Sequence, residues 1–292
     1  MRVLPPILMA AGLLAATTSS FAADQETATY AVDTEIKVVS DQRTRGISDS
    51  LNNPGARLSV QAAHASGLIG LFELSSVSKK QFLDGDGADV TLGAGYRFGN
   101  PEGWHFGVGL AAEIFPGAGF LAPHAIDPDT GMPTDVRRTN FNSEFAVLEI
   151  GYGAIEGRIL NVLSKTYRGI DTGGVCGQML ATMADPTRAL ECYGRGDHNS
   201  RGSWLFDLDY NYDLTPTTKL NLHGGYQLIN HFKEANFADF RVGLTHKRWG
   251  FDWTVAWVGT RVRTRELYLV QDGDAMRPTD SNKLVFAVSR KF

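Results

Sequence analysis

Ionisable side chains recur at alternate positions of this sequence, between apolar neighbours. Around residue 208, for example, Asp207 and Asp209 alternate with Phe206, Leu208 and Tyr210. A charge is costly in an apolar core, so this pattern indicates a face that meets water. The residues predicted to line such an interior are Glu35, Lys37, Arg57, Glu73, Arg97, Glu113, Glu149, Asp207, Asp209, His223, Asp239, Arg241 and Asp252.

The balance of these charges suggests what the interior could do. Acids outnumber bases among them, and a mildly acidic bore would favour cations or neutral polar solutes. The opposite charges could also pair across the interior and plug it. We keep both an open bore and a closed interior as hypotheses at this point.

Two arginines in the segment RTRGIS could act at the mouth of such a bore. Arg43 and Arg45 precede Gly46, which is suited to a tight turn. The segment could fold inward as a constriction, or it could cover the rim of a sheet. We favour the second interpretation.

Catalytic and metal-binding patterns are weak. GDHNS at 196–200 brings Asp197, His198 and Ser200 together, but a hydrolase needs a base and nucleophile on rigid elements with an oxyanion donor. The acidic DGDGAD at 84–89 lacks the ligand spacing of a dedicated calcium site. We therefore predict no enzyme, no metal site and no cofactor.

The two cysteines, Cys176 and Cys192, lie in one polar segment. In an exported protein a nearby pair is most simply a disulfide. A metal or redox pair would need further ligands at a recognisable spacing. We predict the disulfide.

Export is predicted by the N-terminus. Arg2 is followed by a short apolar run and then Ser20-Phe21-Ala22, the pattern of a cleaved signal peptide over 1–22. The remaining 23–292 is expected to form one domain. The chain has 28 basic and 32 acidic residues, which lacks the basic excess of a nucleic-acid-binding protein.

The alternation defines the elements that hold the charged residues. About twelve segments, each near ten residues, alternate with period two and read as β-strands. Short links alternate with long ones such as 117–140, 166–201 and 263–281. Twelve strands enclose more space than side chains fill in a small soluble barrel. We therefore predict an all-β fold: one antiparallel up-and-down transmembrane β-barrel, with short periplasmic turns and long extracellular loops.

Aromatic residues support the same interpretation. They gather beside the short links, as Tyr96, Phe98 and Trp104 do around 99–103, which is typical of a girdle at a membrane interface. The last strand must close the sheet so that no backbone edge meets lipid. Its alternation, with Phe286, Val288 and the terminal Phe292, also resembles the signal read by the barrel assembly machinery.

Residues 38–77 resemble the TorF porin family of proteobacteria. The matching residues are Ser40, Asp41, Arg43, Arg45, Gly46, Ile47, Ser48, Ser50 and Pro54, with the turn His64-Ala65-Ser66-Gly67 and GYRF at 95–98. The match covers roughly the first hundred residues and is architectural afterwards. The third strand departs from the family pattern, and the cysteine-bearing loop is an elaboration. The resemblance implies an outer-membrane barrel and names no substrate.

The sequence thus predicts a porin-like channel in the outer membrane of a Gram-negative bacterium, passing small polar or cationic solutes through a narrow lumen. The alternative is a plugged structural or surface-recognition barrel, with an outer-membrane enzyme a distant third. Expected partners are membrane lipid, lipopolysaccharide, the assembly machinery and small solutes. The solute, gating and oligomeric state are left open by the sequence.

Overall fold

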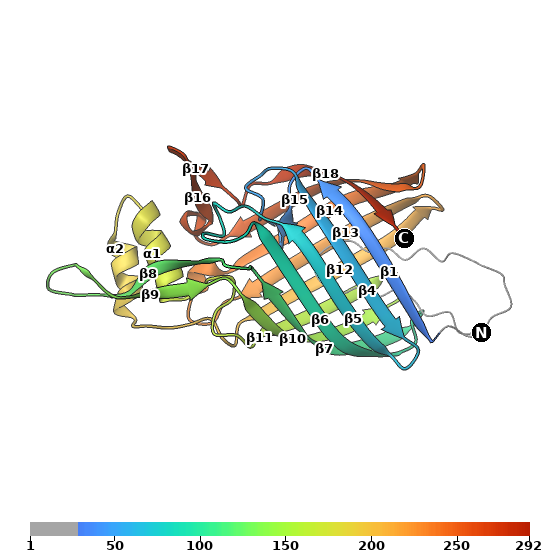
Figure 1. The fold of residues 1–292 in the computed structure, drawn as a ribbon, viewed down its shortest axis with the longest axis horizontal. Coiled ribbons are helices and arrows are strands. Elements are labelled where there is room, and N and C mark those ends of the chain that lie inside the picture. Colours follow the sequence, from blue (N-terminus) through green and yellow to red (C-terminus); the bar gives the residue numbers. More distant parts are fainter. Residues whose placement is uncertain (1–28) are drawn as a thin grey trace.

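Twelve antiparallel strands form a closed barrel in the computed structural model, which describes residues 29–292 (Figure 1). The predicted signal peptide lies outside the described residues. The strands are β1 (Tyr30–Val39), β4 (Gly55–His64), β5 (Leu68–Ser76), β6 (Ala88–Gly99), β7 (Trp104–Ile114), β10 (Ser143–Tyr152), β11 (Ile155–Val162), β12 (Trp204–Thr215), β13 (Thr218–Leu228), β14 (Phe237–Arg248), β15 (Phe251–Val262) and β18 (Lys283–Lys291). The predicted barrel class and strand number are confirmed.

The first and last strands close the barrel. Strand β1 pairs with β18 from Glu35↔Lys291 to Val39↔Ala287, and the backbone N–H of Phe292 donates to the carbonyl of Thr34. The sheet therefore has no open edge along these strands. The C-terminus lies at the end of the barrel that carries the short turns (Figure 1).

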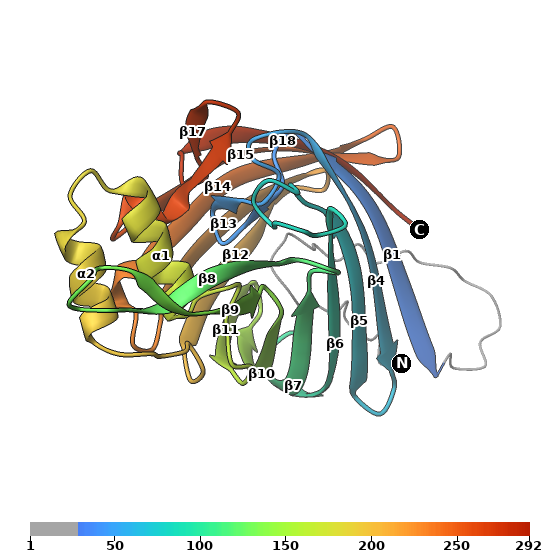
Figure 2. The ribbon, with the colours of Figure 1, turned by 60° about the vertical axis from the view of Figure 1, so that its left-hand side comes forward.

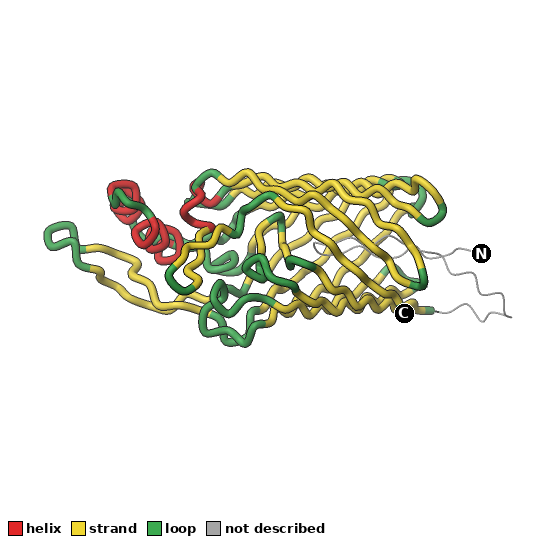
Figure 3. Tube along the Cα trace, turned by 90° about the horizontal axis from the view of Figure 1, so that it is seen from above, coloured by secondary structure: helices red, strands yellow, loops and turns green. Residues whose placement is uncertain are grey.

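The two ends of the barrel differ as the sequence predicts. At one end, the short-turn end, strands are joined by 65–67, 100–103, 153–154, 216–217 and 249–250. At the other, the long-loop end, they are joined by 40–54, 77–87, 115–142, 163–203, 229–236 and 263–282. These long loops build the part of the molecule that projects beyond the barrel in Figures 1 and 3.

The apolar side chains point outward. Leu208, Trp253 and Leu284 are 57%, 45% and 52% exposed, whereas the neighbouring inward position Asp209 is 5% exposed. Rings crowd the outer surface near the short-turn end, where Trp104 packs against Tyr152 with centroids 5.1 Å apart. The outer surface is thus apolar and the interior polar, the reverse of a soluble barrel.

Two strands with unclear alternation have apolar residues inside. On β5, Ile69 and Leu71 pack with Ala63 of β4 within the barrel. On β11, Leu160 and Val162 face the packed loops at the long-loop end. Strict alternation of polar and apolar residues fails on these two strands because the interior itself is apolar there.

The long loops contain structure that the alternation did not predict. They hold the hairpins β2 (Arg43–Thr44) with β3 (Ile47–Ser48), β8 (Gly119–Ile126) with β9 (Pro133–Asn140), and β16 (Leu269–Asp272) with β17 (Ala275–Pro278). They also hold the helices α1 (Thr172–Thr182) and α2 (Thr187–Gly194), and the short 3-10 helices η1 (Lys233–Ala235) and η2 (Arg265–Tyr268). Figure 2 shows α1 and α2 beside the β8–β9 hairpin.

Both helices are fixed by packing. Asp171 caps α1 by accepting the backbone N–H of Gly174 at 2.8 Å, and Val175, Cys176 and Met179 are buried. A cluster of buried residues continues from these helices into the inner wall of β10 and β12. Among residues 29–292, every helix is too short or too polar to span a membrane.

Candidate functional site

The barrel interior holds networks of charged side chains, the largest centred on Asp209 of β12. Its two carboxylate oxygens accept from Arg158 at 2.9 Å, His223 at 2.9 Å and Arg241 at 3.4 Å. His223 also contacts Asp239 at 3.0 Å. Three donors from neighbouring strands therefore converge on one carboxylate.

A second network lies on the β6, β7, β10 and β11 wall. Arg97 donates to Glu149 at 2.7 Å and lies 3.7 Å from Glu156, which contacts His105 at 2.8 Å. Glu149 is completely buried. Gly107 makes room for it, since a Cβ there would lie 2.6 Å from its carboxylate. Small residues on the inner face thus allow long charged side chains to cross it.

Two further ion pairs lie on the inner face of β1, β4 and β5. The Lys37 ammonium lies 3.6 Å from Glu35, and the Nε of Arg57 lies 3.3 Å from Glu73. All four side chains are at most 11% exposed. Ion pairs on the inner wall therefore form both within one strand and between strands.

Arg168 lies among the long loops at the mouth of the barrel. Its guanidinium contacts Asp49 at 2.8 Å and Glu113 at 3.3 Å, and it lies over the rings of Phe82 and Phe115. Burial disfavours the charged form of Arg168, but the two carboxylates outweigh this effect and hold its pKa well above the usual value. Arg168 is therefore a fixed positive charge that connects its own loop to the 40–54 loop and to strand β7.

The β2–β3 hairpin folds into the barrel, and its two arginines have different partners. Arg45 and Gly46, both with positive φ (49° and 77°), form its two-residue turn. Arg45 reaches the far wall and donates to Asp207 at 2.7 Å. Arg43 stays at the rim, where it donates to Asp41 and to the carbonyl of Ser281, each at 2.7 Å.

This hairpin separates two cavities. An outer cavity of about 790 Å³ lies among the long loops, bordered by α1, Phe120, Tyr268 and Gln178. An inner cavity of about 100 Å³ lies inside the barrel, bordered by the Asp209 network. Arg45 lines both. The side chain at the hairpin tip therefore lies between the outer cavity and the inner cavity.

The ionisable residues predicted from alternation occupy the inner face. They are all buried or half-buried: Glu35, Lys37, Arg57, Glu73, Arg97, Glu113, Glu149, Asp207, Asp209, His223, Asp239, Arg241 and Asp252. Most belong to the networks above. Their role toward a solute stays a prediction.

The predicted acidic balance needs correction at the inner cavity. The earlier set omits Arg158, on a strand of unclear alternation, and Arg45, which was expected at the rim. Six cations border this cavity: Lys37, Arg43, Arg45, Arg57, Arg158 and Arg241. Only four carboxylates do so: Asp41, Asp207, Asp209 and Asp239. The electrostatic basis for cation preference is therefore absent at this point.

The GDHNS segment is tied into the loop structure. Ser200 is buried and donates to the carbonyl of Ile170 at 2.6 Å, while the ring of His198 contacts the carbonyl of Arg195 at 2.9 Å. Asp197 contacts Arg137 and His124 instead. Partial burial raises the pKa of Asp197, but these partners outweigh it and the pKa lies below the usual value.

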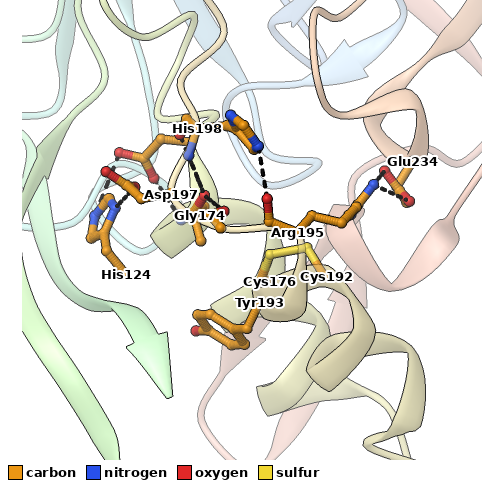
Figure 4. Close-up of a disulfide and its surroundings, with 12 residues drawn as sticks. His124, Gly174, Cys176, Cys192, Tyr193, Arg195, Asp197, His198 and Glu234 are labelled. Carbon is orange, nitrogen blue, oxygen red and sulfur yellow. Dashed lines mark hydrogen bonds and ion pairs between the residues drawn. A yellow bond between two sulfur atoms is a disulfide. The ribbon is translucent and has the colours of Figure 1, made fainter. Parts of the chain in front are cut away.

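The disulfide joins the two loop helices. Cys176 of α1 and Cys192 of α2 are bonded, as predicted (Figure 4). The acidic 84–89 segment is split between two environments: Asp84 pairs with Arg138 at 2.9 Å, and Asp89 is buried. Within residues 29–292, no three His, Cys, Asp or Glu side chains are grouped so as to hold a metal ion.

One family model matches the chain over residues 23–292, and its description is "Bacterial protein of unknown function (Gcw_chp)". The chain belongs to the Gcw_chp family. No curated protein matches this Gcw_chp sequence.

Several solved structures resemble this Gcw_chp barrel in fold. The NanC porin has a TM-score of 0.47 at 8% identity, covering 89% of this chain and 98% of that one. The KdgM porin in complex with disordered oligogalacturonate has a TM-score of 0.43 at 8% identity, covering 89% and 97%. An outer-membrane channel from Pseudomonas putida F1 has a TM-score of 0.39 at 12% identity, covering 92% and 99%. At these identities the likeness concerns the fold alone.

Proposed function

We propose that this protein is a porin-like outer-membrane channel through which small polar solutes diffuse passively, with the β2–β3 hairpin as its constriction. Several features support the location. Strands of 8–12 residues are close to the length of about 9–11 residues that a tilted strand needs to cross a bilayer. Their outward side chains are apolar, and the predicted signal peptide and terminal Phe292 suit export and assembly at that membrane. The TorF resemblance supports the same class.

The observation that carries the channel proposal is the position of Arg45 between the two cavities. On the long-loop side of Arg45, the outer cavity opens among the long loops. On its other side, the inner cavity is bordered by charged groups, which solvate a polar solute better than an apolar wall would. The Arg45 side chain, held by Asp207 and by the carbonyls of Phe206 and Tyr226, is the barrier between the two cavities in this proposal.

The second candidate is a barrel without an open path, whose loops recognise a surface partner. Extensive pairing favours it, since Glu149 is completely buried and Arg158 and Asp209 are each 5% exposed. Such a barrel would still insert in the membrane. It would pass no current.

Single-channel recording of the purified full-length protein in planar bilayers separates the two. We expect small stepwise openings from the wild type. Arg45→Ala removes the side chain between the cavities and should increase the conductance of each step. Arg261→Ala is the matched control, because Arg261 is an exposed arginine near the end of β15 that leads into the long 263–282 loop.

Two outcomes would contradict the proposal. Silence from both the wild type and Arg45→Ala would favour the closed barrel. An equal increase in Arg45→Ala and Arg261→Ala would show that the hairpin tip is not the constriction.

A further inference from the structure

The inner cavity has more positive than negative groups on its walls. The six cations and four carboxylates that border it leave an excess of two positive charges. Glu35 and Glu73 partner Lys37 and Arg57, but they do not border the cavity. Among the groups that face a solute inside, the cations are therefore in excess, and the carboxylates that balance Lys37 and Arg57 lie outside the lining.

Several donors crowd one carboxylate there, while Oδ2 of Asp239, which also borders the cavity, has no hydrogen-bond partner among the described residues. Asp209 is shared by Arg158, Arg241 and His223. The Nε–H groups of Arg158 and Arg241 are buried and make no hydrogen bond to the described residues. A buried donor without an acceptor costs roughly 1–3 kcal/mol. Both guanidinium groups border the cavity, so each can donate to one more anionic partner there.

We propose that this cavity is a binding site for the oxyanion group of a small solute, a carboxylate or a phosphate, held by Arg158 and Arg241. Guanidinium groups bind such groups with paired, charge-assisted hydrogen bonds. The cavity of about 100 Å³ has room for about three waters at roughly 30 Å³ each, enough for one such group.

The placement gives the site a role in selection. It lies directly below Arg45, so a solute that passes the hairpin meets Arg158 and Arg241 next. Resting on the proposed channel, this inference makes the solute class anionic, in place of the cationic class expected from the sequence. The site itself exists whether or not the barrel conducts.

Two readouts on the full-length protein test the site and the channel separately. The first is the thermal unfolding midpoint in sodium phosphate against sodium chloride at equal ionic strength. Phosphate should raise the midpoint of the wild type, because a ligand bound only by the folded state stabilises it. Arg241→Gln and Arg158→Gln should lose this rise, and the exposed control Arg261→Gln should keep it.

The second readout is the reversal potential in a potassium chloride gradient. The wild type should prefer chloride, and Arg241→Gln should shift the preference toward potassium, with Arg261→Gln unchanged. Phosphate stabilisation without any current would leave the oxyanion site standing and overturn the channel. A current with no phosphate effect, or with the same effect in Arg241→Gln and the wild type, would overturn the site and leave the channel.

Discussion

Individual residues of the inner wall are fixed by the partners they share. Glu149 shows the principle: it is completely buried, and Arg97 donates to it at 2.7 Å. Removing one member of a buried ion pair leaves the other charge in a poor environment, so the loss is much greater than at the surface. The interior networks therefore stabilise the barrel as well as lining it.

Glu149→Gln should lower the free energy of unfolding by about 3 kcal/mol, because the Arg97 guanidinium loses its nearest carboxylate. Urea titration in lipid vesicles, followed by tryptophan fluorescence, measures this. Glu234→Gln is the control: Glu234 pairs at 3.1 Å with Arg195, which is 37% exposed, and the loss should be about 1 kcal/mol or less. Equal losses in both variants would contradict the structural role of Glu149.

At the scale of elements, the long loops form a connected assembly around the barrel mouth. Lys80 pairs with Asp272 across two loops, and Arg168 connects Asp49 with Glu113. The disulfide adds a covalent connection between α1 and α2. Its contribution should be local, because both cysteines lie in a single loop.

Replacing Cys176 and Cys192 together by serine should loosen the helices without unfolding the barrel. In the chain-entropy model the disulfide bond opposes opening of this loop by about 3 kcal/mol, so its loss should affect the loop helices and not the barrel strands. Limited proteolysis should therefore become faster in the link 183–186, between the helices. As a control, a reductant should not change the proteolysis rate of the serine variant any further. A fall in the unfolding midpoint of the whole barrel would contradict a local role of the disulfide.

Considered as a whole, the barrel is the part of the molecule that the sequence predicts well. In the proposed membrane barrel, lipid outside and water inside act on alternate residues, so the alternation of Phe206, Asp207, Leu208 and Asp209 predicts which side chains point inward. The rule fails at Ile69 and Leu160, where the interior is apolar, and Arg158 was missed for that reason.

The loops follow no such rule. Helix α1 contains Gly173, Gly174 and Gly177, which disfavour a helix in isolation. It depends on the Asp171 cap and on burial against the barrel mouth. The inward path of Arg45 likewise depends on Asp207, far along the chain, and no local pattern predicts that contact.

In the proposed membrane barrel, alternate residues of one strand meet water inside and lipid outside. Thr254 borders the inner cavity, while Val255 next to it is 37% exposed on the outer surface. The chain has two cysteines, both in the disulfide, so a single introduced cysteine is the only free thiol.

The most direct test is the rate at which a charged, water-soluble thiol reagent modifies Thr254→Cys and Val255→Cys in lipid vesicles, with Thr130→Cys in an exposed loop as the reference for full reactivity. We expect Thr254→Cys to react much faster than Val255→Cys, because only the side chain at 254 faces water inside the barrel. Val255→Cys reacting as fast as Thr254→Cys, or Thr254→Cys remaining protected, would contradict this expectation.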